Sequence, residues 1–167
     1  MFGHKGKEEY MIKVGDKLPN VAVKVMGKEG PEDIQTDILF AGNKVVLFAV
    51  PGAFTPTCSA AHLPGFVVNF DQFKEKGVDT VACMSVNDAF VMDAWSKDQN
   101  AENLLMVADG NADFSEALGL DVDATGYGMG VRSKRFALIA EDGVVTALEV
   151  DEKGLEKSSA ENILSKL

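Results

Sequence analysis

The chain has 167 residues, of which 46% are hydrophobic and 25% are charged, and its formal net charge is −10. That size fits one compact domain, residues 1–167, with a core that needs no disulfide or metal to hold it together. The negative charge argues against nucleic acid and anionic membranes as partners, because both would repel this surface. Two cysteines make no disulfide framework, so we expect a reducing compartment, by default the cytoplasm.

The first residues, 1–13, are polar and charged, and they lack the apolar centre of a secretory signal. We expect them to form a flexible N-terminal extension. No run in the sequence approaches the ~18 apolar residues of a membrane span.

Apolar, β-branched runs predict the first strands of the fold. They are Val21–Met26, Lys44–Val50, Thr80–Val86 and Leu104–Ala108. In Lys44–Val50 (KVVLFAV) every residue after the lysine is apolar, which is typical of a strand covered on both faces.

Helical patterns lie between these strands. The first covers Thr57–Lys76, where Pro64-Gly65 should kink or break the helix. The second covers Asp88–Asn100, with Asp88 as its N-cap. It has four apolar residues near one face, namely Phe90, Val91, Ala94 and Trp95. A third helix covers Asp113–Leu118 and ends at Gly119.

The pattern changes near the end of the chain. Phe136–Ala140 and Val144–Val150 flank Glu141-Asp142-Gly143, and Asp-Gly between apolar runs predicts a β-hairpin. A closing helix follows over Ser159–Leu167, with Ser158 or Ser159 as its cap and Ile163 and Leu164 facing inward. Together the elements predict an α/β chain with a mixed central sheet and helices on both faces. A thioredoxin-like fold has this arrangement, and the pattern alone leaves other α/β folds open.

One segment combines features that activate a thiol. After the strand that ends at Val50 comes a loop rich in proline and glycine, and Cys58 then stands in the first turn of a predicted helix. Unpaired N–H groups and the helix dipole favour a thiolate there. Thr55, three residues earlier, can contribute a hydroxyl. A cationic donor would have to come from elsewhere in the chain.

The same segment resembles a known family. Pro51, Thr55 and Cys58 spell P-x-x-x-T-x-x-C, the peroxiredoxin active-site signature, and PGAFTPTCSAAHLPGF is similar to the type II (atypical two-cysteine, peroxiredoxin-5-like) subfamily. Further similar segments are VNDAFVMDAW, the residues around Ala108-Asp109-Gly110, and VRSKRFAL. The resemblance covers nearly all of Val14–Leu167, and it implies a thioredoxin-like fold.

The resemblance implies a thiol-dependent peroxidase that reduces hydrogen peroxide and small alkyl hydroperoxides. Cys58 would attack the terminal peroxide oxygen and become a sulfenic acid. Thr55 would bind the peroxide and hold the thiolate, and Pro51 would shield the pocket. Arg135 matches the active-site arginine of the family and would stabilise the developing charge, with Arg132 as the alternative. No metal, flavin or haem is implied, and the scattered histidines and cysteines give no metal-ligand spacing.

The resemblance also bears on how the sulfenic acid is reduced. Some relatives carry a resolving cysteine near the position of Lys157, where this sequence has none. Cys83 follows Cys58 by 25 residues, as in plant and bacterial relatives, and is the candidate resolving cysteine. It lies inside a predicted buried strand, so we expect it to be structural or slow. The expected reductant is therefore glutathione, glutaredoxin or thioredoxin. The subfamily also implies a homodimer, with Phe54 and Phe90 as contributors.

Other interpretations stay open. The same cysteine could serve a redox sensor or relay with little turnover. A thiol–disulfide oxidoreductase is disfavoured, because threonine occupies position 55 where C-x-x-C needs a cysteine. His62, four residues after Cys58, could form a protease-type Cys–His pair, but we expect it to bind backbone or line the interface. We interpret TGYGMG (125–130) as a flexible loop rather than a phosphate-binding loop.

Overall fold

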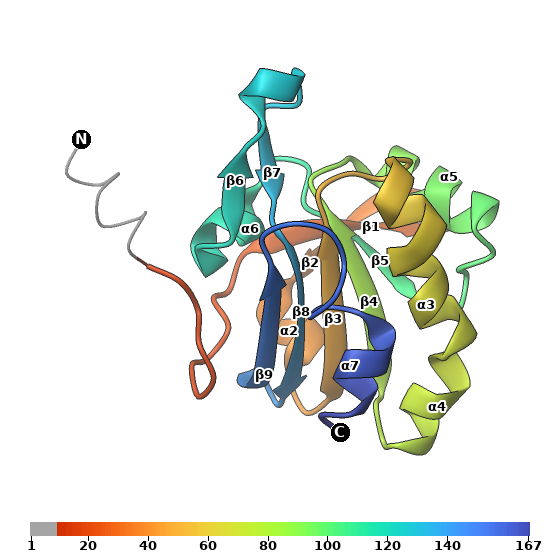
Figure 1. Ribbon diagram of the computed structural model, residues 1–167, viewed down its shortest axis with the longest axis vertical. Coiled ribbons are helices and arrows are strands. Elements are labelled where there is room, and N and C mark those ends of the chain that lie inside the picture. The colour runs from red at the N-terminus through yellow and green to blue at the C-terminus, as the bar shows by residue number, and fades with distance from the viewer. Residues whose placement is uncertain (1–9) are drawn as a thin grey trace.

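The computed structural model describes residues 10–167, and within that range seven strands form a mixed sheet in the order β2-β1-β5-β4-β3-β8-β9 (Figure 1). These strands are β1 Ala22–Gly27, β2 Gly30–Gln35, β3 Lys44–Val50, β4 Thr80–Ser85, β5 Leu105–Ala108, β8 Arg135–Glu141 and β9 Val144–Asp151. β3, β4 and β5 run parallel, whereas β1, β2, β8 and β9 join in antiparallel pairs. The predicted mixed sheet is confirmed.

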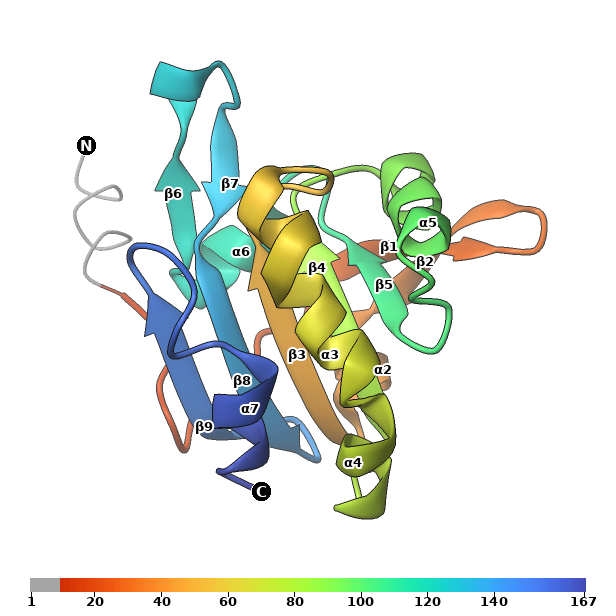
Figure 2. The ribbon, with the colours of Figure 1, turned by 45° about the vertical axis from the view of Figure 1, so that its right-hand side comes forward.

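Helices cover both faces of this sheet, as predicted (Figures 1 and 2). One face carries η1 Cys58–His62, α3 Leu63–Val68, α4 Phe70–Glu75, α5 Ala89–Asp98 and α7 Ala160–Leu164. The other face carries α2 Thr36–Phe40 and α6 Asp113–Leu118. In the described part of the chain, no helix has both the length and the apolar character needed to cross a membrane.

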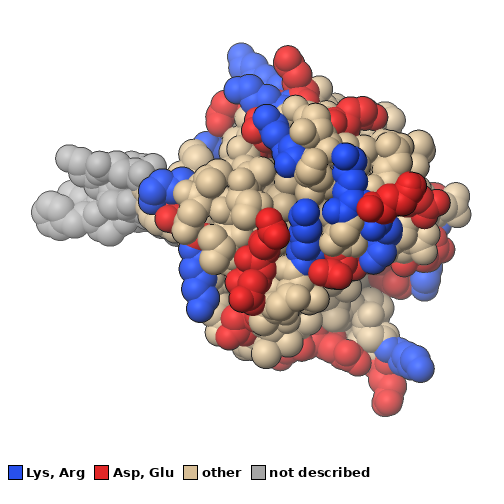
Figure 3. Space-filling model, turned by 90° about the horizontal axis from the view of Figure 1, so that it is seen from below, with Lys and Arg blue, Asp and Glu red and all other residues tan. Residues whose placement is uncertain are grey.

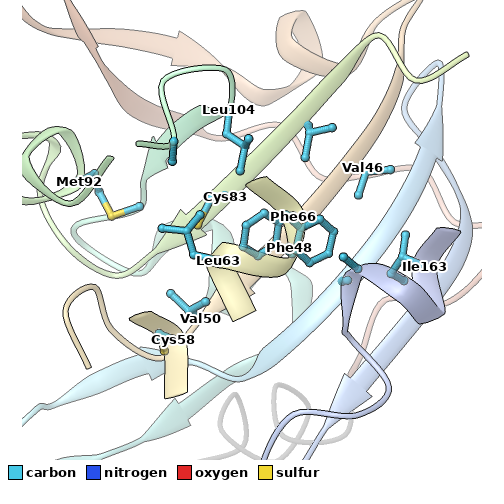
Figure 4. Packing of buried hydrophobic residues seen from close by; sticks show 14 of the residues in the cluster. Val46, Phe48, Val50, Cys58, Leu63, Phe66, Cys83, Met92, Leu104 and Ile163 are labelled. Carbon is cyan, nitrogen blue, oxygen red and sulfur yellow. The ribbon is translucent and has the colours of Figure 1, made fainter. Parts of the chain in front are cut away.

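β3 is an inner strand, between β4 and β8, and its side chains alternate between the two faces of the sheet and so contribute to both halves of the core. Val46, Phe48 and Val50 pack in the cluster that contains Cys58, and Phe48 stacks on Phe66 of α3 at 3.9 Å between ring centroids (Figure 4). The residues between them belong to the cluster on the opposite face, with α2 and α6. The prediction of a strand covered on both faces is therefore correct.

The predicted hairpin near the C-terminal end is also confirmed. Asp142 and Gly143 form its two-residue turn with positive φ angles of 50° and 79°, the conformation that favours Asp-Gly. A register shift between Ile139 and Ala140 displaces the pairing by one residue, so that Arg135 lies opposite Asp151. α7 follows, with Ser159 as its cap and Ile163 buried.

The first predicted helix differs in detail. Thr57–Lys76 is divided into three pieces: η1 is a π-helix, α3 follows with Pro64 in its first turn, and Asn69 leaves helical geometry before α4. Proline is accommodated at a helix start because its missing N–H needs no partner there. Pro64 and Gly65 lie within α3, so the predicted interruption there is wrong: the chain only changes from π to α geometry just before them. The break at Asn69 is not predicted by the sequence.

Three other predictions need correction. On α5 the cap at Asp88 is confirmed, but Phe90 and Ala94 are exposed and the buried residues are Ala89, Met92, Trp95 and Ser96. The edge strand β2 and helix α2 were not predicted, because GPEDIQ is polar and contains proline. The segment interpreted as a flexible loop contains a 3₁₀ turn, η2 Thr125–Tyr127, which joins the two-stranded pair β6 Asp121–Asp123 and β7 Val131–Ser133.

The expected N-terminal extension is shorter than 13 residues. Ile12 is buried in the core and its N–H donates to the carbonyl of Leu118 at 2.9 Å. The remainder of the expected extension, residues 1–9, lies outside the described residues.

Candidate active site

Cys58 is the first residue of η1, and a loop connects it to the end of β3 at Val50. Its side chain is fully buried, at the edge of the cluster shown in Figure 4. The preceding loop is held by Asn87, whose side-chain oxygen accepts from the N–H of Ala53 at 3.0 Å and from Ser85 at 2.6 Å. Phe54 takes a positive φ of 64° in this loop. The loop therefore presents the cysteine from a defined backbone conformation.

The π turn aligns Cys58 with His62. The N–H of Leu63 donates to the carbonyl of Cys58, which is an i→i+5 bond. This wider turn brings residues i and i+4 closer to one face than an α-helix does. Single π turns are frequent at functional sites.

Arg135, at the start of β8, reaches both of these side chains. Its Nη2 donates to Cys58 Sγ at 3.1 Å, and its Nη1 is 2.8 Å from Nδ1 of His62. Alternation along β8 places Arg135 on the same face as Ala137 and Ile139, which pack in the cluster of Cys58. A guanidinium suits this task because its planar fork offers two donors in fixed geometry.

Arg132, the alternative arginine, has another role. Its Nε donates to Met129, and its Nη1 donates to the carbonyl oxygens of Val86 at 3.0 Å and Pro51 at 3.5 Å. Arg132 therefore connects β7 to the loops that follow β3 and β4, and these hydrogen bonds do not include the sulfur of Cys58.

Thr55 and Pro51 lie in the loop between β3 and Cys58. The hydroxyl of Thr55 donates to the carbonyl of Gly52 at 2.6 Å, so its proton is not directed to the sulfur and its lone pairs remain available as acceptors. Pro51 and Arg135 form part of the wall of a cavity of about 210 Å³, together with residues of β9 and the loop after it.

His62 binds the backbone, as predicted, and not the sulfur. Its Nε2 lies 2.9 Å from the carbonyl oxygen of Ser158. A carbonyl only accepts, so Nε2 carries the proton and Nδ1 accepts from Arg135. The pKa of His62 is lowered from 6.5 to about 4: burial lowers it most, the Ser158 hydrogen bond opposes this, Arg135 lowers it further and Asp151 raises it. A protease-type Cys–His pair is absent from this site.

Cys83 lies in β4, in the middle of the sheet, between Phe48 of β3 and Met106 of β5. It is fully buried, and both cysteines are free thiols. Burial, and to a smaller extent the charge of Cys58, raise the pKa of the Cys83 thiol well above its usual value. The expected burial of Cys83 in a strand is confirmed.

Two residues behind the site were not predicted. The sequence identifies Ser158 only as a candidate helix cap and gives no signal for Asp151. Each becomes visible as a site residue only through the hairpin register and the path of the chain after β9.

Among residues 10–167, no group of three or more histidine, cysteine or acidic side chains is arranged to hold a metal ion.

The sequence is similar to known proteins over almost the whole chain. The family model described as Redoxin matches residues 13–164. Peroxiredoxin-2E, chloroplastic, from Arabidopsis thaliana is 47% identical over 163 residues, covering 93% of this chain and 69% of that protein. Peroxiredoxin-2B from the same plant is 45% identical over 161 residues, covering 93% and 98% of the two chains.

A solved structure is similar to this chain in both sequence and fold. The crystal structure of reduced Prx3 in complex with H₂O₂ from Vibrio vulnificus has a TM-score of 0.90 and 57% identity, and the match covers 93% of this chain and 98% of that one. The family model and these relatives extend over almost the whole chain. The chain therefore belongs to the Redoxin family and is a peroxiredoxin, a thiol-dependent peroxidase of thioredoxin-like fold.

Proposed function

We propose that Cys58 is the peroxidatic cysteine of this enzyme. The observation that carries the proposal is the 3.1 Å hydrogen bond from the Arg135 guanidinium to its sulfur, at a side chain that is fully buried. A charge-assisted donor at this distance stabilises the thiolate, which is the nucleophilic form.

The reaction forms one bond and breaks one. The thiolate attacks the terminal oxygen of the hydroperoxide, an S–O bond forms, the O–O bond breaks, and the leaving alkoxide or hydroxide takes up a proton as alcohol or water. Cys58 remains as the sulfenic acid. Arg135 stabilises the charge that moves from sulfur to oxygen. The free lone pairs of Thr55 accept the hydroperoxide O–H, and Pro51 covers the pocket.

The proposed substrates are hydrogen peroxide and small alkyl hydroperoxides. The Vibrio vulnificus relative is described in complex with H₂O₂. A cavity of about 210 Å³ lies beside Pro51 and Arg135, toward β9, and Cys58 and Thr55 are not among its lining residues.

The proposed reductant is an external thiol: glutathione, glutaredoxin or thioredoxin. The first thiol attacks the sulfenic acid, releases water and leaves a mixed disulfide, and a second thiol then restores Cys58. Cys83 is a poor resolving cysteine because its thiol is held protonated within the central sheet, where it cannot move toward Cys58 without opening β4. Two free thiols fit a reducing compartment such as the cytoplasm, which we retain as the proposed location.

Replacement of each cysteine tests this proposal. Cys58→Ser should lower peroxide consumption at least about a thousandfold, whereas Cys83→Ala should keep multiple turnover with an external thiol. Peroxide consumption is followed directly. Sulfenate formation is followed by stopped-flow fluorescence of Trp95, the single tryptophan, whose Nε1 donates to Ser59 beside the site at 3.0 Å. Full activity in Cys58→Ser would contradict the role of Cys58. Loss of turnover in Cys83→Ala would make Cys83 the resolving cysteine.

A further inference from the structure

A continuous series of hydrogen bonds runs from the sulfur of Cys58 into the segment after β9. Arg135 donates to Cys58 Sγ at 3.1 Å and to His62 Nδ1 at 2.8 Å, and His62 Nε2 donates to the carbonyl of Ser158 at 2.9 Å. The N–H and hydroxyl of Ser158 both donate to Oδ2 of Asp151 at 2.8 Å. Arg135, His62 and Ser158 are all buried.

Asp151 holds the loop that ends at Ser158. Besides Ser158, its oxygens accept from the N–H groups of Glu156 at 3.1 Å and Lys157 at 3.0 Å. Burial would raise the pKa of Asp151, but these hydrogen bonds offset it, and the pKa lies below its usual value. The carboxylate thus fixes three successive residues of the loop between β9 and α7 (Figure 2).

The orientation of Ser158 has a chemical consequence for His62. With its carbonyl aimed at Nε2, the imidazole must carry its proton there and offer a lone pair at Nδ1. Only this tautomer accepts a hydrogen bond from Arg135. If Ser158 turns away, the imidazole can take the other tautomer, in which Nδ1–H faces an arginine N–H and the guanidinium loses its anchor.

We propose that Asp151 is a positioning residue for the peroxidase reaction: through Ser158 it holds His62 in the Nε2–H tautomer, and His62 holds Arg135 against Cys58. The inference rests on the proposed role of Cys58. It predicts that the loop between β9 and α7 tunes the reactivity of a sulfur that it does not touch.

The chain contains a second buried carboxylate that serves as a matched control for Asp151. Asp109, after β5, is also a buried carboxylate, and it accepts from the N–H of Phe114 and from the N–H and hydroxyl of Ser115, the last two at 2.8 Å. It fixes the start of α6 on the opposite face of the sheet. The side chains of Asp109 and Asp151 make the same kind of contacts, but those of Asp109 lead to α6, whereas those of Asp151 lead through Ser158 and His62 to Arg135.

The experiment compares Asp151→Asn with Asp109→Asn. Two quantities are measured on each reduced protein: the pH midpoint of Cys58 alkylation, with peptide mapping to separate Cys58 from Cys83, and the second-order rate constant for sulfenate formation at neutral pH. We expect Asp151→Asn to raise the alkylation midpoint and to slow sulfenate formation roughly 3- to 30-fold. Asp109→Asn should lower the unfolding midpoint similarly and leave both quantities of Cys58 unchanged.

Two further variants complete the test. Asp151→Glu keeps both acceptor oxygens and should bring the alkylation midpoint back toward that of the parent. If Asp151→Asn does not fold, Ser158→Ala and Ser115→Ala replace the pair, because each removes one buried hydroxyl that donates to its carboxylate at 2.8 Å. Equal alkylation midpoints and rate constants within a pair would overturn the proposal. Cys58→Ser would still abolish activity in that case, so the role of Cys58 would stand.

Discussion

His62 is a buried side chain that holds other groups of the site in place and does not bind the sulfur itself. It packs against the rings of Phe48 and Phe66, at 5.1 and 5.7 Å between centroids, and lies between Arg135 and Ser158. Burial makes a charged imidazole unfavourable, and the guanidinium of Arg135 beside it adds to that penalty. The lowered pKa of about 4 follows, and His62 is neutral at physiological pH.

This pKa predicts an acid-sensitive stability. The unfolded chain protonates His62 near pH 6.5, but the folded protein does so only near pH 4. The unfolded state therefore binds more protons between these values, and the free energy of unfolding should fall as pH falls from 6.5 to 4, by about 3 kcal/mol from this residue. Urea unfolding at several pH values measures it.

The control for the pH prediction is His62→Gln, which cannot titrate. It should be less stable than the parent at pH 7, because Arg135 and Ser158 lose a partner, and its stability should vary less between pH 4 and 6.5. Equal slopes in the two proteins would show that His62 does not carry the effect. The lowered pKa of Asp151 acts in the same direction only at still lower pH.

At the scale of elements, the glycine that ends a helix can allow another segment to pack closely against that end. α6 ends at Gly119 with φ of 71°, and the segment before β1 lies directly against this end, through the bond from Ile12 to Leu118. A Cβ at Gly119 would overlap the carbonyl oxygen of Tyr10. Gly128 has the same φ of 71° at the end of η2, but nothing lies within 4 Å of its Cβ position.

These two glycines predict different costs for the same substitution. Gly128→Ala should lower the free energy of unfolding by about 1 kcal/mol, the strain of a left-handed backbone alone. Gly119→Ala adds a backbone clash and should cost roughly 3 kcal/mol or more. Urea unfolding of both variants gives the comparison. A similar loss in both would mean that the segment around Tyr10 moves aside freely.

At the scale of the whole molecule, the distribution of charged and exposed aromatic side chains favours association of two copies of the chain. Acidic and basic side chains are interspersed on the face shown in Figure 3. Phe54 and Phe90 are 52% and 65% exposed; the ring of Phe54 contacts that of Trp95 at 6.4 Å between centroids, and Phe90 lies on α5, the helix that carries Trp95. Exposed aromatic rings beside a buried site suit a protein interface, and we propose that a second copy covers them.

Phe90→Asp should therefore weaken a homodimer, which sedimentation velocity across a concentration series measures. Val68→Asp is the control, because Val68 is 80% exposed on α3, away from the active-site loop. We expect a raised dissociation constant only for Phe90→Asp. A parent protein that sediments as a monomer at every concentration would contradict the proposed dimer.

Short-range features were determined by the sequence itself. The apolar run Lys44–Val50 required a doubly covered strand, and Asp142-Gly143 required a tight hairpin. The loop from Pro51 placed Cys58 at a helix start. Each depends on neighbouring residues only, so local propensity and periodicity were sufficient.

Contacts between distant residues were decided by the tertiary structure. Cys58 and Arg135 are 77 residues apart, and His62 and Ser158 are 96 residues apart. From the sequence alone Arg135 was identified only through family resemblance. The hairpin turn by itself pairs Arg135 with Val150, and the register shift after Ile139 changes that partner to Asp151. Such shifts depend on how β8 and β9 pack on the sheet, so the series of hydrogen bonds behind Cys58 exists only in the folded molecule.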